Sequence, residues 1–371
     1  MTQATCETCI GPRFSWDRLP VAFHSSKMET DSRGLFSARE LEVLLRFPMV
    51  TIEKWHGQNA VDAGGQPVFL WEEDAMIAAA RQIKARDPSI VVLVWFDSQM
   101  IYTGWSWPHK LPHGVVNHSL NRDAKGGCAT GHLRAAEFLE THSDYLLKNS
   151  SGLPALADQT GDSQCHIYDY ARPEAQAFWR DHCLNMTRSG VIDGCGADFS
   201  DTDGLQTTRT NATRWGLTPG AAIAYDAGRA AMLRTTTAAL GAGVLLGKTS
   251  GELLRHDPYV TSAAPTQECQ PNNRSITSQR AVAALSREVG ARRIYECHYA
   301  CFNNTTPPGT RTDCIDEAAS FLIAAGEYHY FLTGGWHDSK LDAGNFTTHW
   351  VDGHVQPRPT KARLGVQRVL S

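Results

Sequence analysis

Short runs of strand-forming residues alternate with helical stretches along most of this chain, and this alternation limits the folds that it can adopt. Seven runs have the composition of strands: residues 21–24, 49–53, 90–96, 191–199, 244–248, 293–298 and 328–333. Apolar residues recur with helical spacing at 37–45, 72–86, 132–141, 173–187, 219–240, 278–289 and 316–325. Such alternation predicts a parallel sheet covered by helices.

Seven evenly spaced strands favour an α/β fold of one (β/α)8 barrel of the TIM type, with long loops on its active face. The eighth strand either lies in the Pro-rich tail after Val351 or is missing, which would leave the barrel irregular or incomplete. An open doubly wound sheet is the alternative, but residues 24–27 do not form its Gly-rich phosphate turn. We therefore expect one catalytic domain over residues 1–371, with a loop-rich insertion at 98–170 after the third strand.

Eight of the eleven asparagines begin an N-x-[ST] sequon, where about one or two would be expected by chance. The excess predicts N-linked glycans on the protein, each marking an exposed loop or helix face. A Thr-rich composition is the alternative explanation. The sequons are Asn117, Asn149, Asn185, Asn211, Asn273, Asn303, Asn304 and Asn345.

Ten cysteines, an even number, predict disulfide bonds formed in an oxidising compartment. Sequence proximity favours local pairs between Cys183 and Cys195 and among Cys297, Cys301 and Cys314. A zinc site is the alternative, but the CxxC near the N-terminus has no second pair at matching spacing. We expect disulfides rather than a metal, and no cofactor.

The sequons and cysteines together predict a secreted protein or one of the secretory-pathway lumen. The first thirty residues lack a charged start followed by an apolar stretch, so we expect a signal peptide that is absent from this chain. No apolar run has the length of a membrane span. The net charge of −4 and the lack of Lys/Arg-rich runs disfavour nucleic acid and anionic membranes as partners.

Polar and aromatic residues end each predicted strand, at the edge where barrel enzymes carry their active sites. Any one of these carboxylates has a structural alternative, because a strand-end acid often caps a helix or pairs with a cation. The candidates are His24, Glu53, Trp55, Asp97, Trp105, Trp107, Asp198, Asp201, Lys248, Glu296, His298, Trp336 and Asp338.

Carboxylates and tryptophans on one face predict cleavage of a glycosidic bond. One acid protonates the leaving oxygen, another attacks or activates water, and flat rings pack against sugar faces. Serine hydrolysis fits less well because no G-x-S-x-G elbow occurs. Metal hydrolysis is disfavoured because the chain has no H-E-x-x-H and its histidines are scattered.

Two neighbouring segments resemble a pattern found in several families of TIM-barrel glycoside hydrolases. Residues 167–174 read Ile-Tyr-Asp-Tyr-Ala-Arg-Pro-Glu and lead into an aromatic-containing helix. Residues 190–199 then read Gly-Val-Ile-Asp-Gly-Cys-Gly-Ala-Asp-Phe, a strand of the form Asp-Gly-x-x-x-Asp. The resemblance covers about thirty residues and does not select one named family.

The resemblance implies that Asp198, at the end of the fourth predicted strand, is the nucleophile or general base. Our first choice for the partner acid is Glu296, on the sixth predicted strand, and Glu53 is the second. This departs from the commonest retaining pattern, which uses glutamates on strands four and seven, so the stereochemical outcome stays open. We expect a structural or substrate-ordering part for Asp193.

The sequence thus predicts a secreted glycoside hydrolase acting on an oligo- or polysaccharide, with the other candidates binding the carbohydrate substrate. Two alternatives stay open. One is a non-catalytic carbohydrate-binding barrel, and the other is a polysaccharide lyase using His298 and Tyr299. Only Lys27, Lys54 and Lys248 approach the predicted active face, which favours a neutral sugar.

Overall fold

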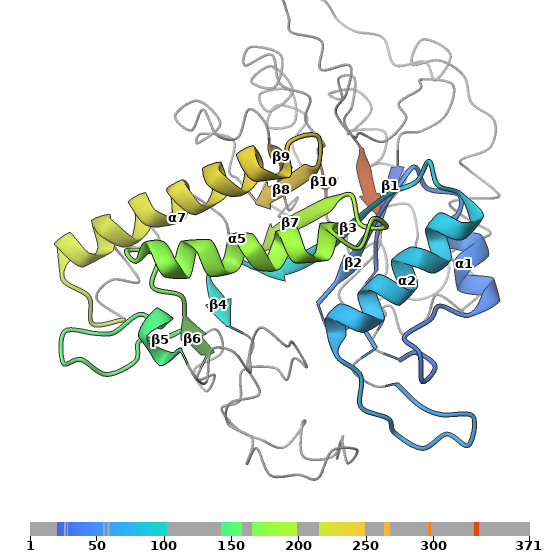
Figure 1. Ribbon diagram of the computed structural model, residues 1–371, viewed down its shortest axis with the longest axis horizontal. Helices are drawn as coiled ribbons and strands as arrows, with labels where there is room; N and C mark the ends of the chain where they lie inside the picture. Colours follow the sequence, from blue (N-terminus) through green and yellow to red (C-terminus); the bar gives the residue numbers. More distant parts are fainter. Residues whose placement is uncertain are drawn as a thin grey trace, which may run out of the picture.

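The computed structural model describes the elements that carry most of the predicted fold (Figure 1). The described residues are 21–25, 27, 29–54, 56–57, 60–101, 142–157, 165–198, 215–248, 263–267, 296–297 and 330–333. The helices predicted at 132–141, 278–289 and 316–325 lie outside these residues.

Eight parallel strands form one sheet in the order β10-β9-β8-β7-β3-β2-β1-β11. The strands are β1 (Val21–Ser25), β2 (Met49–Glu53), β3 (Val91–Asp97), β7 (Gly194–Asp198), β8 (Val244–Lys248), β9 (Ala263–Gln267), β10 (Glu296–Cys297) and β11 (Phe331–Thr333). From β2 to β10, each strand of this sheet pairs with the one that precedes it in the sheet along the chain, and the last strand, β11, pairs with the first. This singly wound order differs from a doubly wound sheet, whose order reverses at a switch point.

Four described helices lie between strands of this sheet in chain order: α1 (Ala38–Leu44), α2 (Glu72–Arg86), α5 (Pro173–Thr187) and α7 (Pro219–Leu240). Ser37 and Glu40 cap α1 with the reciprocal bonds of a capping box. Proline begins both α5 and α7, where its missing N–H costs no helical bond. None of the described helices is both long and apolar enough to cross a bilayer.

The two faces of the sheet carry different cores. On the outer face, Val92, Val94 and Phe96 of β3 pack in one cluster with residues of all four helices. On the inner face, Trp95 belongs to a smaller cluster whose members all come from strands or their immediate ends; in the described part of the chain it contains no helix residue. The four described helices therefore cover one face only, as in a barrel and unlike a doubly wound sheet.

Two glycines let β7 pass close to the inner core. A Cβ on Gly196 would lie 1.7 Å from the Trp95 ring, and one on Gly194 would lie 1.9 Å from the Val244 carbonyl oxygen. The indole thus fills the space above β7, which is why this strand alternates glycine with larger outward residues. The close packing fixes the strand that ends in Asp198.

The strand β9 was not predicted from the sequence, and it supplies the eighth strand of the sheet. The sheet thus has eight strands without the tail after Val351, which lies outside the described residues. Its sequence, Ala-Ala-Pro-Thr-Gln, has little β-propensity, and Pro265 removes one ladder donor. Glu296 accordingly lies on the seventh strand in chain order, and not on the sixth.

The two edge strands of the sheet approach each other in space. Cα atoms of β10 and β11 come within 8 Å, although no ladder joins them in the described residues. Closure into a barrel stays a prediction.

A small antiparallel sheet lies within the predicted insertion at 98–170. It consists of β4 (Met100–Ile101), β6 (Cys165–Ile167) and β5 (Leu156–Ala157), in that spatial order, with a 3-10 helix at Ser143–Tyr145. Figure 1 shows it near the carboxyl-terminal end of β3, which β4 directly follows.

A disulfide between Cys183 and Cys195 joins α5 to β7 and confirms one predicted local pair. It closes a loop with a sequence separation of 12 residues. Such a loop corresponds to about 3 kcal/mol of stabilisation in the chain-entropy view. The pairing among Cys297, Cys301 and Cys314 lies outside what the structure describes.

Candidate active site

Four predicted site residues meet at the carboxyl-terminal edge of neighbouring strands. They are His24 of β1, Glu53 of β2, Asp97 of β3 and Asp198 of β7, with exposed fractions of 3%, 4%, 5% and 0%. Asp97 and Asp198 are cross-strand neighbours in register. Burying three carboxylates together is costly unless cations and hydrogen bonds compensate them.

The compensating cation is Lys54, which directly follows β2. Its Nζ lies 2.8 Å from Glu53 Oε1 and 2.6 Å from Asp198 Oδ2, and its side chain is 1% exposed. The second oxygen of Glu53, Oε2, lies 2.5 Å from His24 Nε2. His24, Glu53, Lys54 and Asp198 thus form one buried chain of polar contacts.

Backbone hydrogen bonds hold the strand ends that carry these groups. The Lys54 amide donates to the Trp95 carbonyl oxygen at 3.0 Å. The amide and hydroxyl of Ser98 both donate to the Asp198 carbonyl oxygen, at 2.8 and 2.6 Å. From α5, Trp179 Nε1 donates to the Asp97 carbonyl oxygen at 2.8 Å. The site is therefore built on rigid elements, as a preorganised site requires.

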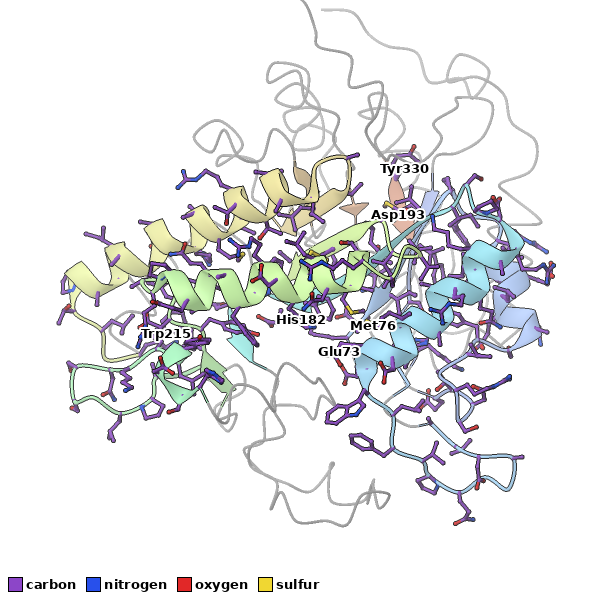
Figure 2. The ribbon with its side chains drawn as sticks, in the orientation of Figure 1. Glu73, Met76, His182, Asp193, Trp215 and Tyr330 are labelled. Carbon is purple, nitrogen blue, oxygen red and sulfur yellow. A yellow bond between two sulfur atoms is a disulfide. The ribbon has the colours of Figure 1, made fainter. Side chains whose placement is uncertain are left out.

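Asp97 lies between this chain of contacts and a second set of largely buried polar side chains, which includes Tyr168, Glu73 and His182. Burial raises the pKa of Tyr168, and the carboxylates of Asp97 and Glu73 raise it further. Glu73, at the start of α2, pairs with His182 of α5 at 3.3 Å. Figure 2 shows Glu73 and His182 near each other between the two helices. Tyr168 therefore stays a neutral phenol at any ordinary pH.

Two further buried polar groups support the loops beside the site. Lys27 pairs with Glu40 at 2.7 Å, and His56 Nε2 is hydrogen-bonded to the Gly34 carbonyl oxygen at 2.9 Å. Burial lowers the pKa of His56 to about 4, against the opposing effect of that hydrogen bond. His56 is thus neutral near pH 7, and its bond to Gly34 makes it a structural residue.

Lys248 and Glu296 are placed by their backbones at the same edge of the sheet. Lys248 pairs in register with Thr266 of β9, and Thr266 pairs with Glu296 of β10. The other candidates, Trp55, Trp105, Trp107, Asp201, His298, Trp336 and Asp338, lie outside the described residues.

Asp193 lies at the opposite, amino-terminal end of β7, where Figure 2 shows it well away from Glu73. Its Oδ2 accepts from Lys84 Nζ at 2.6 Å and from the Val92 amide at 2.8 Å. These contacts support the structural part expected of this residue.

Sequence reasoning placed Lys54 near the active face but did not select it as a site residue. Successive side chains of a strand point to opposite faces of the sheet. The sequence therefore gave no reason to expect the side chains of Glu53 and Lys54 to meet at one site. The structure achieves this with a turn after β2, in which the His56 amide donates to the Glu53 carbonyl oxygen at 3.2 Å. Within the described residues, no group of three or more side chains has the arrangement of a metal site.

No protein-family model matches the sequence, and no curated protein matches it. Among solved structures, the chain is similar to the α-galactosidase TtGalA of Thermus thermophilus, at 13% identity and a TM-score of 0.43, covering 90% of this chain and 62% of that one. It is similar to the glycoside hydrolase domain of PelA from Pseudomonas aeruginosa at 14% identity and a TM-score of 0.46, covering 87% of this chain and 96% of that one.

A third similar structure is the GH36 α-galactosidase AgaA of Geobacillus stearothermophilus, at 10% identity and a TM-score of 0.46, covering 86% of this chain and 40% of that one. The chain thus spans less than two thirds of TtGalA and of AgaA. Similarity at this level carries no argument about activity, which has to rest on the site itself.

Proposed function

We propose that this protein is a secreted glycoside hydrolase that cleaves glycosidic bonds by paired-carboxylate catalysis. The observation that supports it is the convergence of Glu53, Asp97 and Asp198 at the carboxyl-terminal edge of a singly wound parallel sheet. Chemistry at this edge is the rule for barrel folds. Carboxylates are the groups that glycoside hydrolysis needs, both to donate a proton and to attack or activate water.

We also propose that the sheet closes into a (β/α)8 barrel. Three findings support closure: β11 pairs with β1, the helices that the structure describes cover only the outer face, and the edge strands β10 and β11 come within 8 Å. Closure would bring Glu296 toward the same central space as Asp198, across the barrel mouth.

In this proposal Asp198 is the nucleophile or general base. Lys54 stabilises its charge, and the inner packing of β7 fixes its position. As a nucleophile it would bond to the anomeric carbon while the leaving oxygen takes a proton from the second acid. Water would then break the ester, with the second acid acting as base.

Glu296 is our choice for the second acid. With β9 included, Asp198 ends the fourth strand, and Glu296 begins the two-residue seventh strand β10, at the level of Thr266 of β9 and Lys248 of β8. These are the strands that carry the two glutamates of the commonest retaining pattern. Glu53 fits this part less well, because the Lys54 ammonium lies between it and Asp198. Both of its oxygens are already engaged, one by Lys54 and the other by His24.

A panel of neutral aryl glycosides and oligosaccharides tests the proposed function. We expect release of a reducing sugar from at least one neutral substrate. Turnover of uronate polymers alone, with a rise in ultraviolet absorbance from an unsaturated product, would replace the hydrolase by a lyase. Binding of oligosaccharide without turnover would favour the non-catalytic barrel.

We predict that Glu296→Gln impairs hydrolysis most for substrates with poor leaving groups. A general acid contributes only when the departing oxygen needs a proton, which is worth about 10²–10⁴-fold. An activated aryl glycoside should therefore be relatively spared. The comparison is kcat/KM on both substrate types, with Glu42→Gln on the exposed side of α1 as the control. Equal losses on both types would return Glu296 to a binding or structural part.

We further propose that the protein matures in the secretory pathway and carries N-glycans. Two described sequons support this: Asn185 is exposed on α5, and Asn149 lies half-buried in a surface turn. Expression in a eukaryotic secretory host should give a mass that falls on enzymatic deglycosylation, and Asn185→Gln should remove one glycan. An unshifted mass, or more than four free thiols in the unreduced protein, would contradict the proposal.

A further inference from the structure

The position of Lys54 between two acids points to a part in setting the charge of the site. Its side chain is 1% exposed, and its ammonium lies within 2.8 Å of Glu53 and 2.6 Å of Asp198. We propose that Lys54 is a positioning residue that holds Asp198 ionised and oriented, and thereby sets the lower pH limit of activity. This inference rests on the proposed function.

The Lys54 ammonium group contacts one carboxylate on each side, Glu53 and Asp198. Asp198 Oδ2 receives a charged donor, which restrains the orientation of the carboxylate. Glu53 holds the ammonium from the opposite side, and His24 in turn contacts Glu53 at 2.5 Å. Charge-assisted hydrogen bonds of this kind are roughly twice as strong as neutral ones, so the arrangement restricts both carboxylates.

The groups facing Asp198 come from every strand packed around it. They are His24 on β1, Glu53 at the end of β2, Lys54 directly after it, and the cross-strand neighbour Asp97 on β3, while Lys248 ends the adjacent strand β8. Among the described side chains that meet here, three are acids. Without the ammonium, repulsion among these acids would favour proton uptake, and it would do so most at the more deeply buried ones.

Replacement by methionine removes the charge of Lys54 and keeps an unbranched side chain. In Lys54→Met, Asp198 should take up a proton at higher pH than in the parent protein. The acid limb of the kcat/KM profile should then move to higher pH. We expect the midpoint of the acid limb to rise by about one pH unit or more relative to the parent, which corresponds to a tenfold change in the proton affinity of the carboxylate.

Two matched variants separate this effect from loss of an ion pair in general. Lys54→Arg keeps the positive charge and should keep the acid limb in place, even if the bulkier head lowers kcat. Lys84→Met removes a lysine–aspartate pair with the same 2.6 Å separation at the opposite end of β7. It should lower stability without moving the pH profile. An acid limb that stays in place in Lys54→Met would overturn the proposal.

A stability measurement tests the same contact without any substrate. At pH 7, Lys54→Met leaves Asp198 as a buried carboxylate without its ammonium partner. Adding Asp198→Asn removes that charge, so the double variant should have a higher Tm than Lys54→Met alone. Such non-additivity identifies direct coupling between the two side chains. A double variant no more stable than Lys54→Met would show that Lys54 does not act on Asp198.

The two readouts keep the inference and the proposed function separate. Coupling in the Tm measurements without turnover of any sugar would leave the Lys54–Asp198 contact established and refute the hydrolase. Turnover by the parent protein with an unmoved acid limb and additive Tm changes would support the hydrolase and refute the part assigned to Lys54.

Discussion

Asp198→Asn is expected to fold normally and to lose about a thousandfold or more in kcat. The amide keeps the shape of the side chain but removes the negative charge that attacks the anomeric carbon or activates water. Asp198 is fully buried and its charge is matched by Lys54, so the amide also removes one ion pair. Some loss of stability should therefore accompany the loss of activity, and circular dichroism would check that the fold persists.

Asp193→Asn is the control for this prediction, because it changes the same residue type next to the same strand. Asp193 contacts Lys84 and the Val92 amide at the end of the sheet remote from the site. The control should lower Tm and leave kcat within a few-fold of the parent. Activity of Asp198→Asn within tenfold of the parent, on a substrate that the parent clearly turns over, would contradict the assignment.

The helices were predictable because local signals agree with the tertiary packing. Pro173 and Pro219 mark the starts of α5 and α7, and the capping box of Ser37 and Glu40 marks the start of α1. Amphipathic spacing then gave the bounds of α2, α5 and α7. The strand β9 was not predicted because its sequence, Ala-Ala-Pro-Thr-Gln, has no local strand signal.

The sequence predicted which edge of the sheet carries the site, but it did not predict the contacts among the site residues. Parallel strands end at one edge, so the positions of His24, Glu53, Asp97 and Asp198 followed from finding the strands. The bridging part of Lys54 did not follow, because it depends on a turn after β2 and on a contact 144 residues away along the chain. Long-range ion pairs of this kind leave no periodic signal in the sequence.

The second large effect is expected on stability, from Gly228→Ala in the middle of α7. A Cβ there would lie 1.6 Å from the Tyr170 carbonyl oxygen and 2.4 Å from its carbon. Backbone atoms cannot swing aside as a side-chain end can, so α7 or the segment before α5 has to move. We expect a net loss of about 1–3 kcal/mol, even though alanine gains about 1 kcal/mol in helix propensity over glycine.

Gly220→Ala makes the same substitution in the first turn of the same helix, where a Cβ would have nothing within 4 Å. It should leave stability unchanged or raise it by up to about 1 kcal/mol, so the two variants should differ in sign. Chemical denaturation of both measures this directly, and a Gly228→Ala protein as stable as Gly220→Ala would refute the tight contact. Tyr170 lies just before α5, and Trp179 of α5 donates a hydrogen bond to the Asp97 carbonyl oxygen. A displacement of α5 should therefore also reduce activity.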